Sequence, residues 1–335
     1  MDFALFRLPH STDIQLWIGK VDTNPLPIEF NSEKKFILGK FNSGDSVYHL
    51  RPHLELKNKE IDYSQLKFHF TEAKEQLSNK NTYCAIVEEA VKTMKKHTSL
   101  RKVVLTRSHV FHEKLNAIES FKNLCKAYPN AFVHLSSSEI TGTWLGASPE
   151  NFISLNNSEF KTVALAGTFH SNNGEANWTQ KEVNEQNWVE IHIEHVLSSL
   201  NINYSKTGPE TMRIGDLFHL ISTYKAKQQT NFNLNQLIKE LNPTPAVGGI
   251  PKNESTAFIN KHEMLNRELY TGIIGPYYSN HQMELFVNLR CLQIHKTSFT
   301  QYAGAGITAL SIPQNEWLET ENKIAMTKNY LAITN

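Results

Sequence analysis

Hydrophobic and polar positions along the chain follow two periods, one helical and one extended. Between residues 78 and 98 the apolar residues recur every three or four positions, and Tyr83, Ile86, Ala90 and Met94 share one face. This spacing is typical of an amphipathic helix. Shorter segments elsewhere alternate between apolar and polar residues or are continuously apolar, and these segments predict strands.

The two periods, followed along the chain, predict helices separated by groups of strands. The predicted helices cover about 78–98, 117–129, 179–200 and 253–272, with a last one from about 313 onward. Short strands are predicted within the first 75 residues, and longer strands at 101–111, 131–137, 142–148, 151–156, 160–168, 284–295 and 298–307. The segment 241–251, LNPTPAVGGIP, is predicted to be irregular because it combines X-Pro pairs with paired glycines. Tight turns between successive strands predict an antiparallel sheet and an α+β fold rather than alternating βαβ units.

Bulk composition excludes several classes of protein. The 335 residues carry a formal net charge of +1, so neither nucleic acid nor an anionic membrane surface is an expected partner. Cys84, Cys125 and Cys291 are odd in number and lack the CxxC spacing of a zinc site, which argues against a disulfide framework and a structural zinc ion. The start, MDFALFRLPH, does not resemble a signal peptide, and no run reaches the roughly 18 apolar residues of a membrane span. We therefore expect a reduced, cytoplasmic protein built as one large domain or two closely associated ones.

Gly304, Gly306 and Ala309 match the pattern G-x-G-x-x-G/A of dinucleotide-binding loops. That pattern is informative only where a helix starts at the glycines and a further strand and an acidic residue follow within a βαβ unit. Here only a terminal helix remains, and Pro313 interrupts the helix that would have to start at the glycines. A dinucleotide site is therefore not expected.

Two side chains could serve as a base and an acid. Lys102 lies in a predicted strand on the same face as Val104 and Thr106. It is either a water-facing lysine at a sheet edge or a desolvated amine that can accept a proton. Glu150 follows Ser-Pro at the junction of a strand and a turn, and is either a simple turn residue or an acid held in place by the rigid proline. The residues alone leave both choices open.

Carboxylates and cationic groups elsewhere are suited to a metal ion and an anionic ligand. Glu182 and Glu185 share one face of a predicted helix. Glu319 and Lys323 follow a glycine-containing segment, and are either a solvated i,i+4 pair or a seat for a metal ion and an anion. Arg290 lies within an apolar predicted strand, where arginine usually binds a carboxylate or a phosphate. Together these groups predict Mg²⁺ and a small polyanion, in the simplest case a dicarboxylate.

A long series of short motifs runs through the second part of the chain. In order they are KVVLTR, GASPE, ALAGT, KEVNEQ, HLIST, NPTPAVGG, EMLNRELYTGIIG, FVNLRC and AGAGI followed by EWLETENK. Over about residues 78–330 the series resembles the chorismate-utilising enzymes, which include isochorismate, anthranilate, aminodeoxychorismate and salicylate synthases. The resemblance implies one large α+β domain with an antiparallel β-sandwich core, helices packed outside, and Mg²⁺ and chorismate bound between the sheets. Residues 1–75 are expected to be its N-terminal strand-rich part, and residues 76–335 its chorismate-binding catalytic core.

The same resemblance implies roles for individual residues. Lys102 matches the base that activates water, and Glu150 matches the acid that protonates the departing 4-hydroxyl group. Glu185 and Glu319 match the Mg²⁺ ligands. The positions that match substrate-binding residues are Gly167, Thr168, His219, Ala246, Arg290, Tyr302, Gly304 and Lys323.

Lys102 also indicates the branch of the family that uses water, because the ammonia-using branches typically lack this lysine. We expect an isochorismate synthase, an isomerase that adds water at C2 of chorismate and removes the C4 hydroxyl group with Mg²⁺ as cofactor. A salicylate synthase, which also eliminates pyruvate, and an inactive chorismate-binding protein are the alternatives. No glutamine amidotransferase segment is present, so we expect no such subunit, and we expect a monomer. Menaquinone and siderophore biosynthesis both stay open as pathways.

Four residues near the expected site receive no direct role. Gln186 stands where a histidine commonly follows the metal-binding glutamate, and Asn242 stands where a histidine usually precedes PTP. Both keep a hydrogen-bonding group and are expected to support their neighbours. Glu316 and Glu321 are expected on the solvated side of the terminal helix, apart from Glu319.

Overall fold

The computed structural model describes residues 1–29, 31–44, 46–73, 79–96, 99–170, 176–214, 217–227 and 233–334. Its helices are α1 (Lys80–Lys95), α2 (Ala117–Ala127), α3 (Gln180–Ser199), α4 (Leu234–Leu241), α5 (Lys252–His262) and α6 (Pro313–Lys328). Short 3-10 helices lie at Asn58–Glu60 and Tyr63–Gln65. The strands are β1 (Asp2–Arg7), β2 (Ile14–Val21), β3 (Leu26–Pro27), β4 (Lys35–Leu38), β5 (Ser46–Lys57), β6 (Lys102–Phe111), β7 (Lys114–Leu115), β8 (Phe132–Ser138), β9 (Gly142–Ser148), β10 (Asn151–Asn156), β11 (Glu159–His170), β12 (Tyr204–Ile214), β13 (Leu217–Lys227), β14 (Gly249–Ile250), β15 (Ile273–Ser279), β16 (Gln282–Val287), β17 (Cys291–Ile294), β18 (Phe299–Ile307) and β19 (Ile333–Thr334).

The strands form one antiparallel ladder. Its order is β12–β13–β11–β10–β16–β15–β4–β5–β2–β1–β8–β9–β17–β18–β6–β14, and β3 pairs beside β5 in the same 17-stranded sheet. The antiparallel sheet and the α+β class predicted from the strand pattern are confirmed. The N-terminal strands β1 to β5 occupy the middle of the ladder and join its two halves through β8 and β15.

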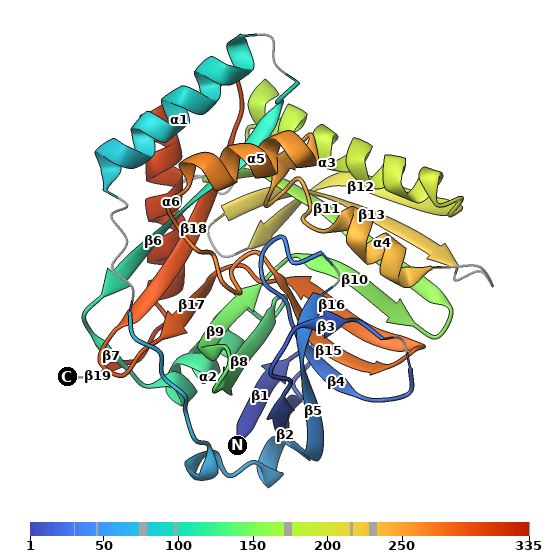
Figure 1. The fold of residues 1–335 in the computed structure, drawn as a ribbon, viewed down its shortest axis with the longest axis vertical. Coiled ribbons are helices and arrows are strands. Elements are labelled where there is room, and N and C mark those ends of the chain that lie inside the picture. Colours follow the sequence, from blue (N-terminus) through green and yellow to red (C-terminus); the bar gives the residue numbers. More distant parts are fainter. Residues whose placement is uncertain are drawn as a thin grey trace.

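The helices lie outside the sheet and gather mainly at one end of the molecule. Figure 1 shows α1, α3, α5 and α6 at the end opposite the N-terminal strands β1, β2 and β5. Helix α3 packs on β11, α6 on β18, and α1 on α6. The two ends of the strand ladder, β11 with β13 and β18 with β6, therefore each carry one long helix.

Helix α3 begins where the sequence predicts. The Thr179 hydroxyl accepts the Lys181 N–H, while the Glu182 carboxylate accepts the Thr179 N–H at 3.0 Å. This capping box satisfies N–H groups that have no partner inside the helix. Because the cap fixes the first turn, it also fixes which face of α3 turns toward β11.

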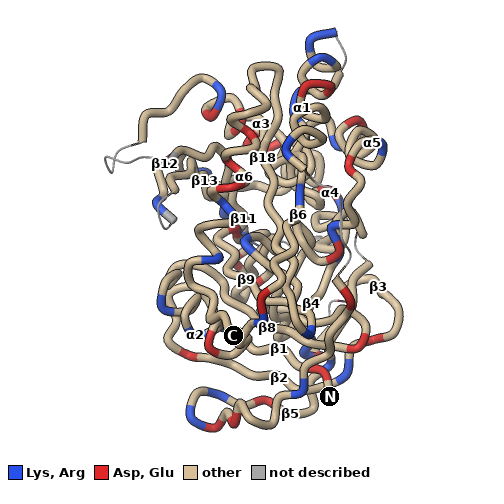
Figure 2. The backbone as a smooth tube through the Cα atoms, turned by 90° about the vertical axis from the view of Figure 1, so that its left-hand side faces the viewer, with Lys and Arg blue, Asp and Glu red and all other residues tan. Residues whose placement is uncertain are grey.

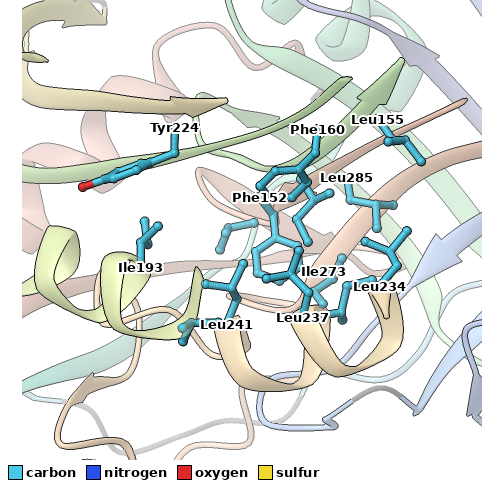
Figure 3. Packing of buried hydrophobic residues seen from close by; sticks show 14 of the residues in the cluster. Phe152, Leu155, Phe160, Ile193, Tyr224, Leu234, Leu237, Leu241, Ile273 and Leu285 are labelled. Atoms are coloured by element: carbon cyan, nitrogen blue, oxygen red, sulfur yellow. The ribbon is translucent and has the colours of Figure 1, made fainter. Parts of the chain in front are cut away.

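The largest hydrophobic cluster lies between strands β10, β11, β13 and β16 and helices α3 and α4 (Figure 3). Helix α4 contributes Leu234, Leu237, Ile238 and Leu241, all buried and spaced at i, i+3, i+4 and i+7. This spacing places them on one face. Burial of each such side chain stabilises the fold by roughly 1.5–3 kcal/mol, so the cluster holds α3 and α4 firmly against the sheet.

Two predicted elements are shorter than expected. The helix predicted over 253–272 is wrong in its second half, because α5 ends at His262. The Glu263 carboxylate accepts the Thr106 N–H at 3.0 Å and binds the Arg267 guanidinium, which ties the following segment to β6 instead. The helix predicted over 78–98 is observed as α1, and its predicted ends at 78, 97 and 98 lie outside the described residues.

Acidic and basic side chains are interspersed over the molecule rather than separated by sign. Figure 2 shows blue Lys and Arg segments and red Asp and Glu segments scattered among each other along the backbone. Among the described segments, no helix is both long enough and apolar enough to cross a membrane.

Candidate active site

One cavity lies between the two ends of the strand ladder. Its walls include residues of β11 and β13 from one end and of β6 and β18 from the other, and it encloses about 740 Å³ of empty space with its open mouth included. Its lining combines apolar residues with a few converging polar and charged groups, which is typical of a small-molecule site. The predicted substrate-binding residues that line it are Gly167, Thr168, His219, Ala246, Arg290, Tyr302, Gly304 and Lys323. Glu150 and Glu185 line the same cavity, so the structure brings most of the predicted site together.

Lys102 lies at the start of β6, fully buried, beside this cavity. Its Nζ is 2.8 Å from Oε1 of Glu185 on α3. The pair occupies the space beside Gly306, where an added Cβ would lie 2.3 Å from Oε1 of Glu185 and 3.1 Å from Cε of Lys102. Lys102 is therefore a buried lysine paired with a carboxylate and not a water-facing edge residue, and a glycine at 306 leaves room for the pair.

Glu150 is buried at the junction of β9 and β10. The Thr244 hydroxyl donates a hydrogen bond to its Oε1 at 3.3 Å. Burial raises the pKa of Glu150 to about 8, although this hydrogen bond and the charge of Lys102 act in the opposite direction. Glu150 therefore keeps its proton at neutral pH and can donate it into the cavity.

Arg290 provides a buried cation at the cavity wall. The expectation that it lies inside a strand is wrong: the strand predicted over 284–295 is divided into β16 and β17, and Arg290 lies in the turn between them with a φ of 48°. Its Nη1 is buried and has no hydrogen-bond partner within the described part of the chain. Burial lowers the pKa of Arg290 to about 10. A buried guanidinium with a free N–H group is suited to binding a ligand carboxylate.

His219 connects Arg290 to strand β11. Its Nδ1 donates to the Gly167 carbonyl at 3.0 Å and lies 3.5 Å from the Thr168 hydroxyl, while its Nε2 accepts from Nη2 of Arg290 at 3.2 Å. Burial, together with the charges of Arg290 and Lys323, lowers the pKa of His219 to about 3. The imidazole is therefore neutral, with its proton on Nδ1, and it can hold the guanidinium without competing for an anion.

Glu319 and Lys323 form a pair on the face of α6 that packs against β18. Lys323 Nζ donates to Oε1 of Glu319 at 2.7 Å and to the Gly304 carbonyl at 2.9 Å. Both side chains are only about a quarter exposed, at 22% for Glu319 and 24% for Lys323. Lys323 lines the cavity, whereas Glu319 does not line it and is joined to it through its contact with Lys323.

Lys181 and Glu316 join this cluster, and the sequence did not predict their contribution. Lys181 Nζ donates to Oε1 of Glu316 at 2.7 Å, and Glu316 is 1% exposed. Burial and repulsion by Glu319 raise the pKa of Glu316 to about 7. The expectation that Glu316 faces solvent is therefore wrong, because Glu316 begins the buried stripe of α6. Glu321 is about half exposed and pairs with Arg107 instead.

Glu185 and Glu319 are the carboxylates that could hold a hard divalent cation. Although burial favours the neutral form, the charges of Lys102 and Lys181 lower the pKa of Glu185, so its carboxylate is ionised. Although burial acts in the opposite direction, the charges of Glu319, Glu316 and Glu185 raise the pKa of Lys181, so a lysine cation balances part of the negative charge here. Within the described residues, no three or more His, Cys, Asp or Glu side chains are grouped to hold a metal ion. A cation bound there would take only a few protein carboxylates and complete its coordination with ligand and water oxygens, a pattern typical of Mg²⁺.

Comparison with known proteins agrees with this arrangement. The family model described as chorismate binding enzyme matches residues 41–332 of the chain. The chain belongs to the chorismate-binding enzymes. The match includes every predicted site residue from Lys102 to Lys323.

Individual relatives of this chorismate-binding enzyme include two isochorismate synthases of Escherichia coli (strain K12). The chain is 30% identical to MenF over 278 residues, which cover 78% of the chain and 63% of MenF. It is 29% identical to EntC over 202 residues, which cover 57% of the chain and 52% of EntC. The alignments thus span less than two thirds of either relative. The solved structure of Escherichia coli MenF, described as the menaquinone-specific isochorismate synthase, superposes with a TM-score of 0.82 at 22% identity and covers 99% of this chain and 89% of that one, which confirms the fold.

Two positions at which this chorismate-binding enzyme departs from the family pattern lie just behind the cavity wall. Asn242 donates from Nδ2 to the Gly44 carbonyl at 3.0 Å, and thereby ties the 241–251 loop to the N-terminal part of the chain. Gln186 accepts the Ala166 N–H at 2.9 Å, next to the cavity-lining Gly167. Both side chains are buried and hydrogen-bonded, in agreement with supporting positions.

Proposed function

We propose that this chorismate-binding enzyme is an isochorismate synthase that converts chorismate to isochorismate. The observation that carries the proposal is the presence, at one cavity, of two buried groups: Lys102, which contacts the cavity-lining Glu185, and Glu150, which lines the cavity and is protonated at neutral pH. A water-for-hydroxyl exchange needs one group that removes a proton and one that supplies a proton, and this pair can do both.

In this proposal Lys102 first loses its ammonium proton to solvent and then takes a proton from a water molecule as the water oxygen bonds to C2 of chorismate. The ring double bonds shift, and the bond between C4 and its hydroxyl oxygen breaks. Glu150 gives its proton to that departing hydroxyl group, which leaves as water. Proton transfer through solvent from Lys102 to Glu150 then restores both groups, so one water enters and one water leaves.

The other residues of the cavity would hold the substrate's two carboxylates. Arg290, oriented by His219, offers a free guanidinium N–H to one of them. Lys323, which lines the same cavity and donates to the Gly304 carbonyl, would contact the other. Glu185 and Glu319 would hold Mg²⁺, which when bound neutralises carboxylate charge and orients the substrate. Fixed contacts of this kind bring C2 and C4 to the base and the acid.

The proposal agrees with the names of the relatives, since MenF and EntC are both isochorismate synthases. The test is incubation of the purified protein with chorismate and Mg²⁺, followed by chromatographic separation of the products. Accumulation of isochorismate supports the proposal, and its absence contradicts it. Salicylate fluorescence without an added lyase would instead assign the salicylate synthase reaction, and binding of chorismate without turnover would assign a binding role.

A further inference from the structure

Gln186 occupies an internal position on α3 that faces strand β11. Its side chain is 2% exposed and does not line the cavity. Its Oε1 accepts the Ala166 N–H at 2.9 Å, and its Nε2 donates to the Ala164 carbonyl at 3.2 Å and to Oε1 of Glu190 at 3.1 Å. The side chain thus connects one turn of α3 to two residues of β11.

The amide of Gln186 has only one orientation that satisfies these partners. Although burial favours the neutral form, hydrogen bonds from Lys206, Ser222 and Gln186 lower the pKa of Glu190, so Glu190 is ionised and accepts hydrogen bonds only. Lys206 Nζ lies 2.7 Å from Oε2 of Glu190 and fixes that carboxylate in place. The Gln186 nitrogen must therefore face Glu190, and its oxygen must face the Ala166 N–H.

The Ala166 N–H lies at the start of a bulge in β11. Ala166 pairs with Leu220 and Thr168 pairs with His219, so Gly167 is the extra residue between them, with a φ of +64°. An extra residue weakens the local ladder and needs other contacts to hold its shape. Gln186 supplies such a contact on the side of α3.

The other side of the bulge is held by the substrate-binding groups. The Gly167 carbonyl accepts from Nδ1 of His219 at 3.0 Å, and His219 accepts from Arg290 at 3.2 Å. A continuous series of contacts therefore runs from Gln186 through the bulge at Gly167 to His219 and Arg290. Of this series, Ala166, Gly167, His219 and Arg290 line the cavity, whereas Gln186 does not.

We propose that Gln186 is a positioning residue for substrate binding, which sets the orientation of Arg290 by fixing the β11 bulge. The inference rests on the proposed function in one respect, namely that chorismate is the ligand of Arg290. Gln186 makes no bond to the reacting atoms in this proposal. Its loss is therefore expected to weaken chorismate binding and to leave the chemical step nearly unchanged.

The test compares Gln186→Met, which keeps length and volume but removes the hydrogen bonds, with Gln186→His, which keeps a nitrogen that can accept the Ala166 N–H. Glu194→Gln is the matched control, because Glu194 lies on the same helix and binds the same Lys206 at 2.8 Å without touching β11. Chorismate KM, kcat and the calorimetric dissociation constant of chorismate are measured for each protein. Magnesium affinity is measured separately without chorismate.

Gln186→Met is expected to raise KM and the dissociation constant about tenfold, with kcat within about twofold of the wild type. Gln186→His is expected to recover most of the affinity, and Glu194→Gln to retain it. Magnesium affinity without chorismate should not change, since Glu185 is intact. An unchanged dissociation constant in Gln186→Met, or a loss confined to kcat or to magnesium affinity, would overturn the inference.

A milder variant keeps the inference testable if Gln186→Met does not fold. Glu190→Gln leaves Gln186 in place but removes the carboxylate that orients its amide, and about a threefold rise in the dissociation constant is expected. An unchanged value would contradict the inference. Binding and turnover are measured separately. Wild-type protein that binds chorismate but makes no isochorismate would therefore refute the proposed function. The chorismate dissociation constants of the variants would still decide this inference.

Discussion

Nζ of Lys102 on β6 lies 2.8 Å from Oε1 of Glu185 on α3. This contact joins the proposed base to a proposed metal ligand, although 83 positions of sequence separate them. The space that both side chains use is left free by Gly306 on β18. The positions of base and metal ligand therefore depend on a residue that has no side chain, and this dependence leads to the first prediction.

Gly306→Ala is expected to lower kcat/KM by about a hundredfold or more while the protein stays folded. The added Cβ would lie 2.3 Å from Oε1 of Glu185, and a flexible carboxylate end moves away more readily than backbone does. Steady-state kinetics at several magnesium concentrations measure the loss. Gly44→Ala, where no atom lies within 4 Å of the added methyl group but the φ of +65° strains any residue with a side chain, is the control and should lose some stability yet keep its activity. A fully active Gly306→Ala enzyme would contradict the placement of the pair.

Glu150, the proposed acid, should determine how activity falls at alkaline pH. Burial raises the pKa of Glu150 to about 8, so kcat/KM should fall as the pH rises above 8 and Glu150 loses its proton. Glu150→Gln should lower the rate by about 10²–10⁴-fold and remove this dependence from the residual activity. Glu284→Gln is the control, because burial also raises the pKa of Glu284 but its side chain does not line the cavity. An unchanged alkaline limb in Glu150→Gln would assign the acid to another group.

The same carboxyl group affects stability. Since the pKa of Glu150 is raised from 4.5 to about 8 on folding, the folded protein keeps a proton that the unfolded chain has lost between these pH values. The wild type therefore loses stability from Glu150 as the pH rises from about 4.5 to 8, by an amount on the order of 4 kcal/mol. Glu150→Gln does not titrate, so its free energy of unfolding relative to the wild type should rise over this range. Urea unfolding at both ends of the range measures the difference, and a constant difference would contradict the burial effect.

Substitution of Arg290 should have opposite effects on protein stability and on chorismate binding. Its guanidinium is buried without an anionic partner among the described residues, so Arg290→Met should raise the free energy of unfolding of the ligand-free protein by about 1–2 kcal/mol. The same substitution should raise the chorismate dissociation constant by about a hundredfold. Thermal unfolding and calorimetry measure the two effects.

Arg107→Met provides the contrast for Arg290. Arg107 is more completely buried than Arg290, and it donates to the Thr320 hydroxyl at 2.6 Å, pairs with Glu321 and lies 4.0 Å from the centre of the Trp317 ring. Loss of these contacts should destabilise the protein and leave chorismate affinity unchanged. If both variants were destabilised equally, Arg290 would be a structural residue rather than an anion-binding one.

The local sequence pattern predicted those features of the fold and the site that depend on residues close together in the chain. The start of α3 at Thr179, the antiparallel strands and the motif positions of Lys102 and Glu150 all followed from short segments. The end of α5 was missed because Glu263 and Arg267 bond to a strand that is distant in sequence. Such contacts are not visible in local periodicity.

The sequence predicted which residues form the site but not the hydrogen bonds and ion pairs between them. The motifs led to Arg290 and His219 separately, whereas the bond between them requires β13 to lie beside the turn after β16. Glu316 was expected to face solvent because a carboxylate on a terminal helix usually does, yet packing of α6 against α1 and β18 buries it with Lys181. One signal was available: Lys181 precedes Glu185 by four residues and therefore shares its helix face.

The central claim is tested most directly by the origin of the new oxygen in the product. The enzyme is incubated with chorismate and Mg²⁺ in water enriched in oxygen-18, and the product is separated and analysed by mass spectrometry, alongside Lys102→Ala. The account predicts isochorismate that carries one solvent oxygen at C2 from the wild type and none formed by Lys102→Ala. Unlabelled isochorismate, or full activity of Lys102→Ala, would contradict it.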